Sequence, residues 1–522
     1  MYSVNSLNIK SYIFIASYII ICLLLISTDS FTHDLYIRDD SAIYFMSGKA
    51  WMNGLVPYTD FADSKGPLLW LIYGIAYLLS PYNYLGVFFM HCIVYVFVFI
   101  VVFKILKLYF NNEAALSGTL LSSLFIFFPT YFNQARAEHF CHPFIIMGLY
   151  MLLSSMKGTA PKYKYGILMG ISIVGCFMIK WTIAFEMCSF ACCLSYLAFK
   201  NKTTKYYVVG LMIGILLLLI PFGVYFAIAG NFDDFIKEYF LNTYNTVKMP
   251  IPQMLGYYFL YEIPQMLVTL RVLAVIYILP ALFIFKTEKT NDFIVRYMPF
   301  ACALFFVMIT AKHCINNHYI NSCSLFSVFV VIWIMQRYKT LFEKHLLIFA
   351  VCILSLTLGG HILVDYKKGF ANLYTSNSQY MQDFYKASFI VGQIDNARIL
   401  NFGGERGIGM AGTSTLPACK YWTQQIGATE QMLAGPLKTL YNKEADFVVC
   451  SPTDVSMCKN IKKAGYNPVM SSLQYGKTYD FMLFSKHHNL IMPPASFKVT
   501  KLDVLFKQSI RNKIFQTIDN LK

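Results

Sequence analysis

Charged residues are scarce in this chain of 522 residues. Asp, Glu, Lys and Arg make up 13% of it, whereas 57% of the residues are hydrophobic and 17% are aromatic. Soluble domains carry roughly 25% charged residues. The scarcity therefore excludes an ordinary soluble domain, a disordered chain and a small disulfide-rich protein, and it indicates a membrane protein.

A continuous basic stripe is also missing, although the net charge is +16. Lys and Arg stand in groups of one to three between apolar runs, as they do in the cytoplasmic loops of membrane proteins. The sequence therefore predicts no nucleic-acid partner. An internal sequence repeat is absent as well, which argues against a transporter built from two related halves.

The 14 cysteines show no zinc motif, because C-x-x-C does not occur and no Cys/His spacing is typical of a zinc site. Most of them lie in apolar runs and behave there as small hydrophobic residues. Cys450 and Cys458 lie in the last part of the chain. A disulfide between them requires that this part lies outside the cytoplasm.

Long apolar runs are abundant. A helix needs about 20 apolar residues to cross a membrane. The chain offers eleven candidate spans, of which the first lacks a cleavage site and is expected to be retained: 11–28, 84–103, 114–131, 141–156, 165–181, 182–199, 206–229, 266–286, 295–311, 319–336 and 345–364.

The apolar segment 67–80 is too short to span, and a Pro-Tyr-Asn turn follows it. If this segment crossed, the lysine clusters at 104–107, 157–164 and 200–205 would lie outside, against the positive-inside rule. We therefore predict that it lies along the outer membrane surface and that the N-terminus lies inside. Loop 29–83 and everything after residue 364 then share the outer side.

The last 158 residues contain 19 basic and 11 acidic residues, a density close to that of a soluble domain. Short apolar runs at 397–402, 446–450 and 480–484 predict strands, and 454–464 predicts a helix capped by Ser451 or Thr453. The glycine-rich segment 403–407 is expected to be a strand-ending turn, since it lacks the phosphate-loop pattern. We expect a membrane domain, 1–364, and a small α/β domain, 365–522.

Polar residues concentrate in loop 29–83. Asp39 and Asp40 are expected to begin a helix, because carboxylates suit its N-terminal dipole. Asp40 and Tyr44, four residues apart, then share one face. Lys65 stands two residues before the apolar segment that begins at Pro67. The alternative is a capped helix followed by a solvated loop.

This loop resembles the first periplasmic loop of the GT-C class of polyprenyl-phosphate-sugar glycosyltransferases, which includes protein O-mannosyltransferases and lipid A aminoarabinose transferases. Asp40 with Tyr44 matches the acidic element of that class. The segment 65–68, Lys-Gly-Pro-Leu, with Trp70 matches its Lys-Pro-Pro-Leu element. One departure is Ile43, because the aminoarabinose enzymes carry an arginine directly before the tyrosine. Another cation must then complete the phosphate site.

The resemblance implies that Asp40 is a general base, with Asp39 as the second candidate. Lys65 would bind the donor phosphate, and Tyr44 and Asp63 would bind substrate. A carboxylate close to cations suits a reaction whose leaving group is an anionic lipid phosphate. For Lys65 the alternative is a lysine that anchors at the lipid headgroups.

Further site candidates lie in other outer loops. Arg136, Lys312 and Tyr319 are expected at the donor phosphate, and Glu138 and His318 at the substrate. The alternatives are an Arg/Glu pair at the end of a span and a histidine at the membrane interface. No cofactor is required, and a divalent cation held by Asp40 and Glu138 is left open.

Residues 232–240 of the outer loop 230–265 predict an amphipathic helix at the membrane interface. It either gates lipid entry or only connects two spans, and the second interpretation is favoured because its acids match no motif.

The sequence thus predicts an α-helical polytopic membrane protein with a GT-C-like fold and a small C-terminal extracytoplasmic α/β domain. We expect a bacterial inner-membrane glycosyltransferase whose site faces the periplasm. It would move a sugar from a polyprenyl-phosphate donor to a glycan, lipid or protein hydroxyl, with inversion. The alternatives are a flippase for lipid-linked saccharides and an envelope polysaccharide polymerase or ligase.

Overall fold

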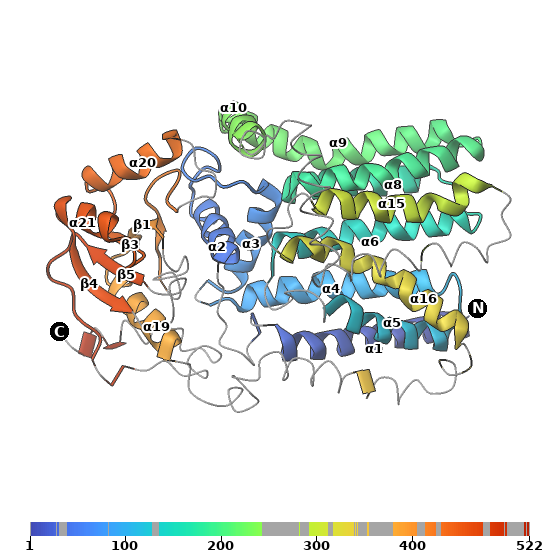
Figure 1. Ribbon diagram of the computed structural model, residues 1–522, viewed down its shortest axis with the longest axis horizontal. Coiled ribbons are helices and arrows are strands. Elements are labelled where there is room, and N and C mark those ends of the chain that lie inside the picture. The colour runs from blue at the N-terminus through green and yellow to red at the C-terminus, as the bar shows by residue number, and fades with distance from the viewer. Residues whose placement is uncertain are drawn as a thin grey trace, which may run out of the picture. The chain divides into compact units, whose positions relative to one another are not determined.

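A computed structural model shows a mostly helical chain with one β-sheet near its C-terminus (Figure 1). By its contacts the chain divides into two units. The first comprises Met1–Ile26, His91–Tyr225 and Met249–Lys367, and the second comprises Ser27–Met90, Phe226–Lys248 and Lys368–Lys522. The structure describes residues 2–27, 29–30, 39–81, 83–127, 135–242, 281, 292–311, 317–338, 340, 342, 352–353, 379–403, 413–423, 430–472, 481–494, 496–497, 516–517 and 519–520.

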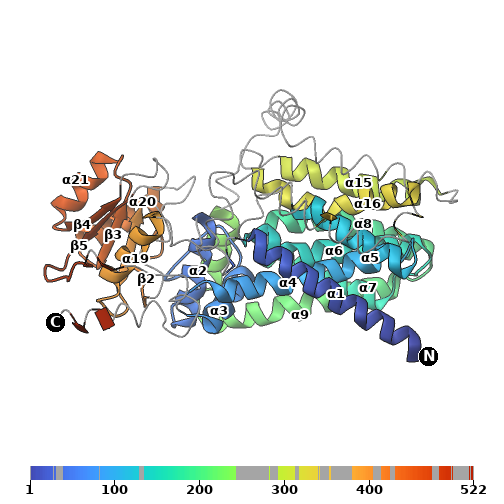
Figure 2. The same cartoon turned by 90° about the horizontal axis from the view of Figure 1, so that it is seen from below.

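The first unit consists of long helices that run side by side in both views (Figures 1 and 2). Their bounds are α1 Tyr2–Ile26, α4 Leu85–Leu106, α5 Asn112–Phe127, α6 Ala137–Met156, α7 Tyr163–Ile179, α8 Trp181–Lys200, α9 Thr204–Ile228, α15 Phe293–Ala311, the 3-10 helix Asn317–Phe326 and α16 Ser327–Arg337. The first residues of α4 and the last residues of α9 belong to the second unit.

Five helices in the described part are long and apolar enough to cross a membrane: Ile9–Ile26, Leu85–Leu106, Ala137–Met156, Trp181–Lys200 and Thr204–Ile228. Three shorter apolar helices coincide with further predicted spans, namely Tyr163–Ile179, Phe293–Phe306 and Asn321–Arg337. The predicted spans 266–286 and 345–364 lie almost entirely outside the described residues. A helical membrane protein is therefore confirmed, and the number of eleven spans stays a prediction.

Two pairs of glycines bring α7 and α9 into close contact. Gly166 and Gly170 lie one turn apart on α7, and Gly210 and Gly214 have the same spacing on α9. A Cβ atom at Gly170 would lie 2.3 Å from the Leu211 carbonyl oxygen. Small residues at this spacing let membrane helices approach to backbone contact, where van der Waals packing holds them together.

The second unit contains the helices α2 Asp39–Met52, α3 Pro67–Leu79, α10 Phe232–Phe235, α19 Gln379–Val391, α20 Glu430–Tyr441 and α21 Val455–Lys463. A π-helix, Ile236–Asn242, continues α10. Helix α2 begins at Asp39 and α3 begins at Pro67, as predicted from the sequence. The helical segment predicted at 232–240 is also present, and it buries Phe235 and Tyr239, whereas Phe232 and Ile236 of the predicted apolar face are exposed.

The sheet has five strands in the order β2-β1-β3-β5-β4. Their bounds are β1 Arg398–Phe402, β2 Leu416–Pro417, β3 Phe447–Cys450, β4 Asn467–Ser472 and β5 Phe481–Ser485. Strand β1 is parallel to β2 and β3, and β5 is antiparallel to β3 and β4. The three strands predicted from the sequence correspond to β1, β3 and β5, and Gly403 directly after β1 has a positive φ of 112°.

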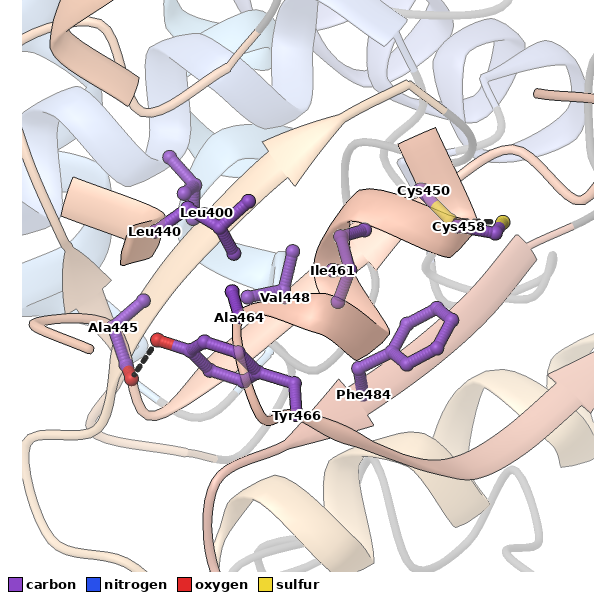
Figure 3. Packing of buried hydrophobic residues seen from close by; sticks show 10 residues of the cluster. All are labelled: Leu400, Leu440, Ala445, Val448, Cys450, Cys458, Ile461, Ala464, Tyr466 and Phe484. Carbon is purple, nitrogen blue, oxygen red and sulfur yellow. Dashed lines mark hydrogen bonds between the residues drawn. The ribbon is translucent and has the colours of Figure 1, made fainter. Parts of the chain in front are cut away.

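Helix α21 covers this sheet through the buried residues drawn in Figure 3. Ile461 is fully buried, and the Tyr466 hydroxyl donates to the Ala445 carbonyl at 2.9 Å. The cap of α21 is Asp454, whose Oδ1 accepts from the Met457 amide at 2.9 Å. The prediction of Ser451 or Thr453 as the cap was wrong, because the helix begins at Val455, one residue later than a Thr453 cap requires and three later than a Ser451 cap requires.

We predict that Gly214→Ala destabilises the first unit, because its new methyl group would lie 2.1 Å from the Ile167 carbonyl oxygen. Separating two packed helices to admit it should cost about 1–3 kcal/mol. Gly223→Ala on the same helix is the control, since nothing lies within 4 Å of a Cβ atom there. Unfolding in detergent measures both variants, and equal stabilities would contradict the close contact.

Candidate functional site

The acidic motif lies at the start of helix α2. Asp39 and Asp40 are its first two residues, and the side chain of Asp40 is half-buried. The free amides of a first helical turn favour a carboxylate there. One turn later, Tyr44 is buried, with 2% of its surface exposed. Helix α2 thus directs an acid and a tyrosine along one side, as the sequence predicts.

The structure brings Lys65 onto this tyrosine. The Lys65 ammonium lies 5.7 Å from the centre of the Tyr44 ring, which also meets the Tyr73 ring edge-to-face at 5.6 Å. An ammonium over an aromatic face is attracted to the ring quadrupole. Helices α2 and α3 permit this proximity because they cross at Gly48, where a Cβ atom would lie 2.4 Å from the Gly74 amide nitrogen. The two matched sequence elements are therefore neighbours in space.

A tight loop before α3 fixes the backbone of Lys65. The Tyr58 hydroxyl donates to the Lys65 carbonyl at 2.9 Å, and Tyr58 itself has a positive φ of 65°. Burial, with the nearby Tyr239 and Asp63, raises the pKa of the Tyr58 hydroxyl, so this group keeps its proton and stays a donor. The loop is therefore held by a buried donor that neutral pH does not ionise.

The two acids of this loop hold its turns. Asp60 Oδ2 accepts from the Val56 amide at 2.7 Å, and Asp63 Oδ1 accepts from the Ser64 amide at 2.6 Å. The Lys65 ammonium donates to the Ser64 hydroxyl at 3.1 Å. Asp63 was predicted to bind substrate; here it orders the turn before Lys65, and its role towards substrate stays a prediction.

A buried lysine of α2 was not recognised from the sequence. Lys49 is 1% exposed, and its ammonium donates to the Thr413 carbonyl at 2.7 Å and to the Thr415 hydroxyl at 3.3 Å. Its partners stand more than 360 positions later in the chain, so no local pattern could have indicated them.

The first unit buries a second polar group. Arg136 precedes α6, and Glu138 in its first turn is 3% exposed. Lys180, between α7 and α8, donates to Glu138 at 2.5 Å and is 8% exposed. Glu186, six residues after Lys180 on α8, is also buried. Glu138, which was predicted to bind substrate, is therefore part of a buried ion pair with Lys180.

Three histidines of the first unit, His91, His139 and His142, were also missed. The rings of His91 and His139 stack at 5.4 Å, and His142 Nδ1 lies 2.8 Å from the Tyr95 hydroxyl. Asn321 contacts both His139 and His142. Two of the three, His139 and His142, could have been recognised from the pattern Glu-His-x-x-His at 138–142, because it places its polar residues on one helical face.

Four predicted residues have no described side chain, and one of them is Asp39, of which only the backbone at the start of α2 is described. Lys312 lies outside the described residues, whereas His318 and Tyr319 belong to the 3-10 helix Asn317–Phe326, of which only the backbone is described there. Among the residues that the structure does describe, no group of three or more His, Cys, Asp or Glu side chains is placed to hold a metal ion.

Comparisons with known proteins indicate the class of fold. Residues 64–226 match the family described as dolichyl-phosphate-mannose-protein mannosyltransferase. ArnT from Cupriavidus metallidurans bound to undecaprenyl phosphate has a similar structure, with a TM-score of 0.53 and 11% identity over 93% of this chain and 99% of that chain. Its apo state gives 0.51 and 10% over the same shares. No curated protein matches the chain in sequence.

We predict that Lys180→Met destabilises the first unit by about 3 kcal/mol or more, because it leaves buried carboxylates without their cation. Lys200→Met is the matched control, since Lys200 pairs with Asp292 at the same 2.5 Å, but its side chain is 49% exposed against 10% for Lys180. An exposed pair contributes less than about 1 kcal/mol. Similar losses for both variants in detergent unfolding would show that the Lys180 pair is not buried.

Proposed function

We propose that this chain, a GT-C glycosyltransferase, moves a sugar from a polyprenyl-phosphate donor to a hydroxyl group of a cell-envelope acceptor. The observation that carries the proposal is the position of Lys65 over the ring of Tyr44, one helical turn after Asp40. This position supports the interpretation that the two sequence elements that resemble this class act together in one site. The ArnT structure bound to undecaprenyl phosphate supports the class of donor.

In the proposed reaction Asp40 accepts the proton of the acceptor hydroxyl. The oxygen then attacks the anomeric carbon, a new C–O bond forms with inversion, and the bond to the lipid phosphate breaks. Lys65 neutralises the charge that grows on the departing phosphate. Its ammonium suits this task because the Tyr44 ring and the Ser64 hydroxyl hold it close to the start of α2. Asp39 is the second candidate for the base.

The remaining assignments extend this proposal. Arg136, Lys312 and Tyr319 would contribute to phosphate binding, and Glu138 and His318 to substrate binding. The proposed topology has eleven spans, with loop 29–83 and the C-terminal α/β domain on the periplasmic side of a bacterial inner membrane. The mixed sheet after residue 397 supports a folded soluble domain there.

We predict that Asp40→Asn lowers kcat by about 10²- to 10⁴-fold, because an amide cannot accept the proton. The assay is sugar transfer from a polyprenyl-phosphate donor by purified protein. Asp454→Asn is the control, since asparagine replaces aspartate well as a helix cap and Asp454 belongs to α21. A normal rate for Asp40→Asn together with a normal rate for Asp39→Asn would refute the proposed base.

The proposed orientation predicts a disulfide between Cys450 and Cys458. Their Sγ atoms lie 2.9 Å apart at the end of β3 and in α21, close enough to bond without moving the sheet. A periplasmic thiol-disulfide oxidoreductase would take up the two electrons and two protons. Thiol labelling of the unfolded protein should then count two more thiols after reduction. Cys450→Ser should abolish the difference and Cys419→Ser should keep it. Equal counts in the parent protein would contradict the orientation.

A further inference from the structure

Lys420 and Tyr421 join the loop of Lys65 to the helical segment 232–242, all within the second unit. The Ala62 amide donates to the Lys420 carbonyl at 2.8 Å. The Lys420 ammonium lies 2.9 Å from Glu238 Oε1 and 3.4 Å from Asp234 Oδ1. One residue thus contacts the loop through its backbone and the helical segment through its side chain.

Glu238 is the anchor of this contact. It is 5% exposed, so its carboxylate needs partners to offset the lost hydration. Besides Lys420, the Tyr421 hydroxyl donates to both of its oxygens, at 2.7 and 2.8 Å. Burial and this carboxylate raise the pKa of Tyr421, so the phenol keeps its proton. The described partners of this buried carboxylate thus include a cation and a neutral donor.

The helical segment also holds the loop directly. The Asn231 side chain donates to the Pro57 carbonyl at 2.6 Å. The Tyr58 ring contacts Phe235 and Tyr239, with ring centres 5.4 and 6.3 Å apart. Because Tyr58 donates to the Lys65 carbonyl, each of these contacts constrains the backbone that carries Lys65.

We infer that Lys420 and Glu238 are positioning residues for donor binding, and this inference rests on the proposed function of Lys65. They do not touch the donor. They hold the loop 57–65 between the helical segment 232–242 and residues 420–421, so that the Lys65 ammonium stays above Tyr44. The segment before α20 is then part of the donor site's framework, and the acids at 234 and 238 have a task that no local motif indicates.

The experiment compares Lys420→Glu, Glu238→Lys and the variant that carries both changes. Each single change places two like charges together and should raise KM for the polyprenyl-phosphate donor about tenfold or more, with kcat changed about twofold at most. The double variant restores an opposite pair and should recover most of the KM. Lys420→Arg should keep KM within about twofold of the parent value.

Lys486→Glu is the control, because it breaks a pair with Asp446 at the sheet and leaves the loop untouched. Normal donor KM in both single variants, or a double variant no better than the singles, overturns the inference. A single variant that does not fold is replaced by Tyr421→Phe, which removes one donor to Glu238 and should raise KM in the same direction. Activity retained by Asp40→Asn and Asp39→Asn would refute the proposed function separately.

Discussion

The cost of burying a charge governs where this chain places its few ionic groups. The two lysines that are buried in the described part both meet oxygen: Lys180 meets Glu138, and Lys49 meets Thr413 and Thr415. Lys420, which is partly buried, meets the buried carboxylate of Glu238. Removing one partner of such a contact leaves a group that neither water nor protein solvates. Each of these contacts therefore offsets part of the cost of placing a charged group in the protein interior. These pairs also fix segments that lie far apart in the sequence.

Lys65 differs from these pairs in its described contacts. Its ammonium lies over the ring of Tyr44 and donates to the Ser64 hydroxyl. Asp60 and Asp63, the acids of the same loop, accept from backbone amides. These two carboxylates therefore order the turns that carry Lys65.

Local features of the fold were predictable because they depend on neighbours in sequence. The acid pair that begins α2, the proline that begins α3 and the apolar runs of β1, β3 and β5 each have a signal within a few residues. The cap of α21 shows the limit, since Ser451, Thr453 and Asp454 all carry suitable oxygens and only the backbone decides among them. The pairs of Lys49 and Lys420 have no such signal, because their partners stand far away along the chain.

The segment 232–242 shows how a missing motif can mislead. Its acids match no pattern of the GT-C class, which favoured a simple connection between two spans over a gate. In the structure these acids have partners that neither interpretation predicted. Asp234 and Glu238 both lie close to the Lys420 ammonium, and Glu238 also accepts from the Tyr421 hydroxyl. A carboxylate as buried as Glu238 is costly unless its partners are fixed, so the contact requires an ordered segment 420–421. Glu238 thus links residues 420–421 to the helical segment, and the Ala62 amide links the same residues to the loop of Lys65.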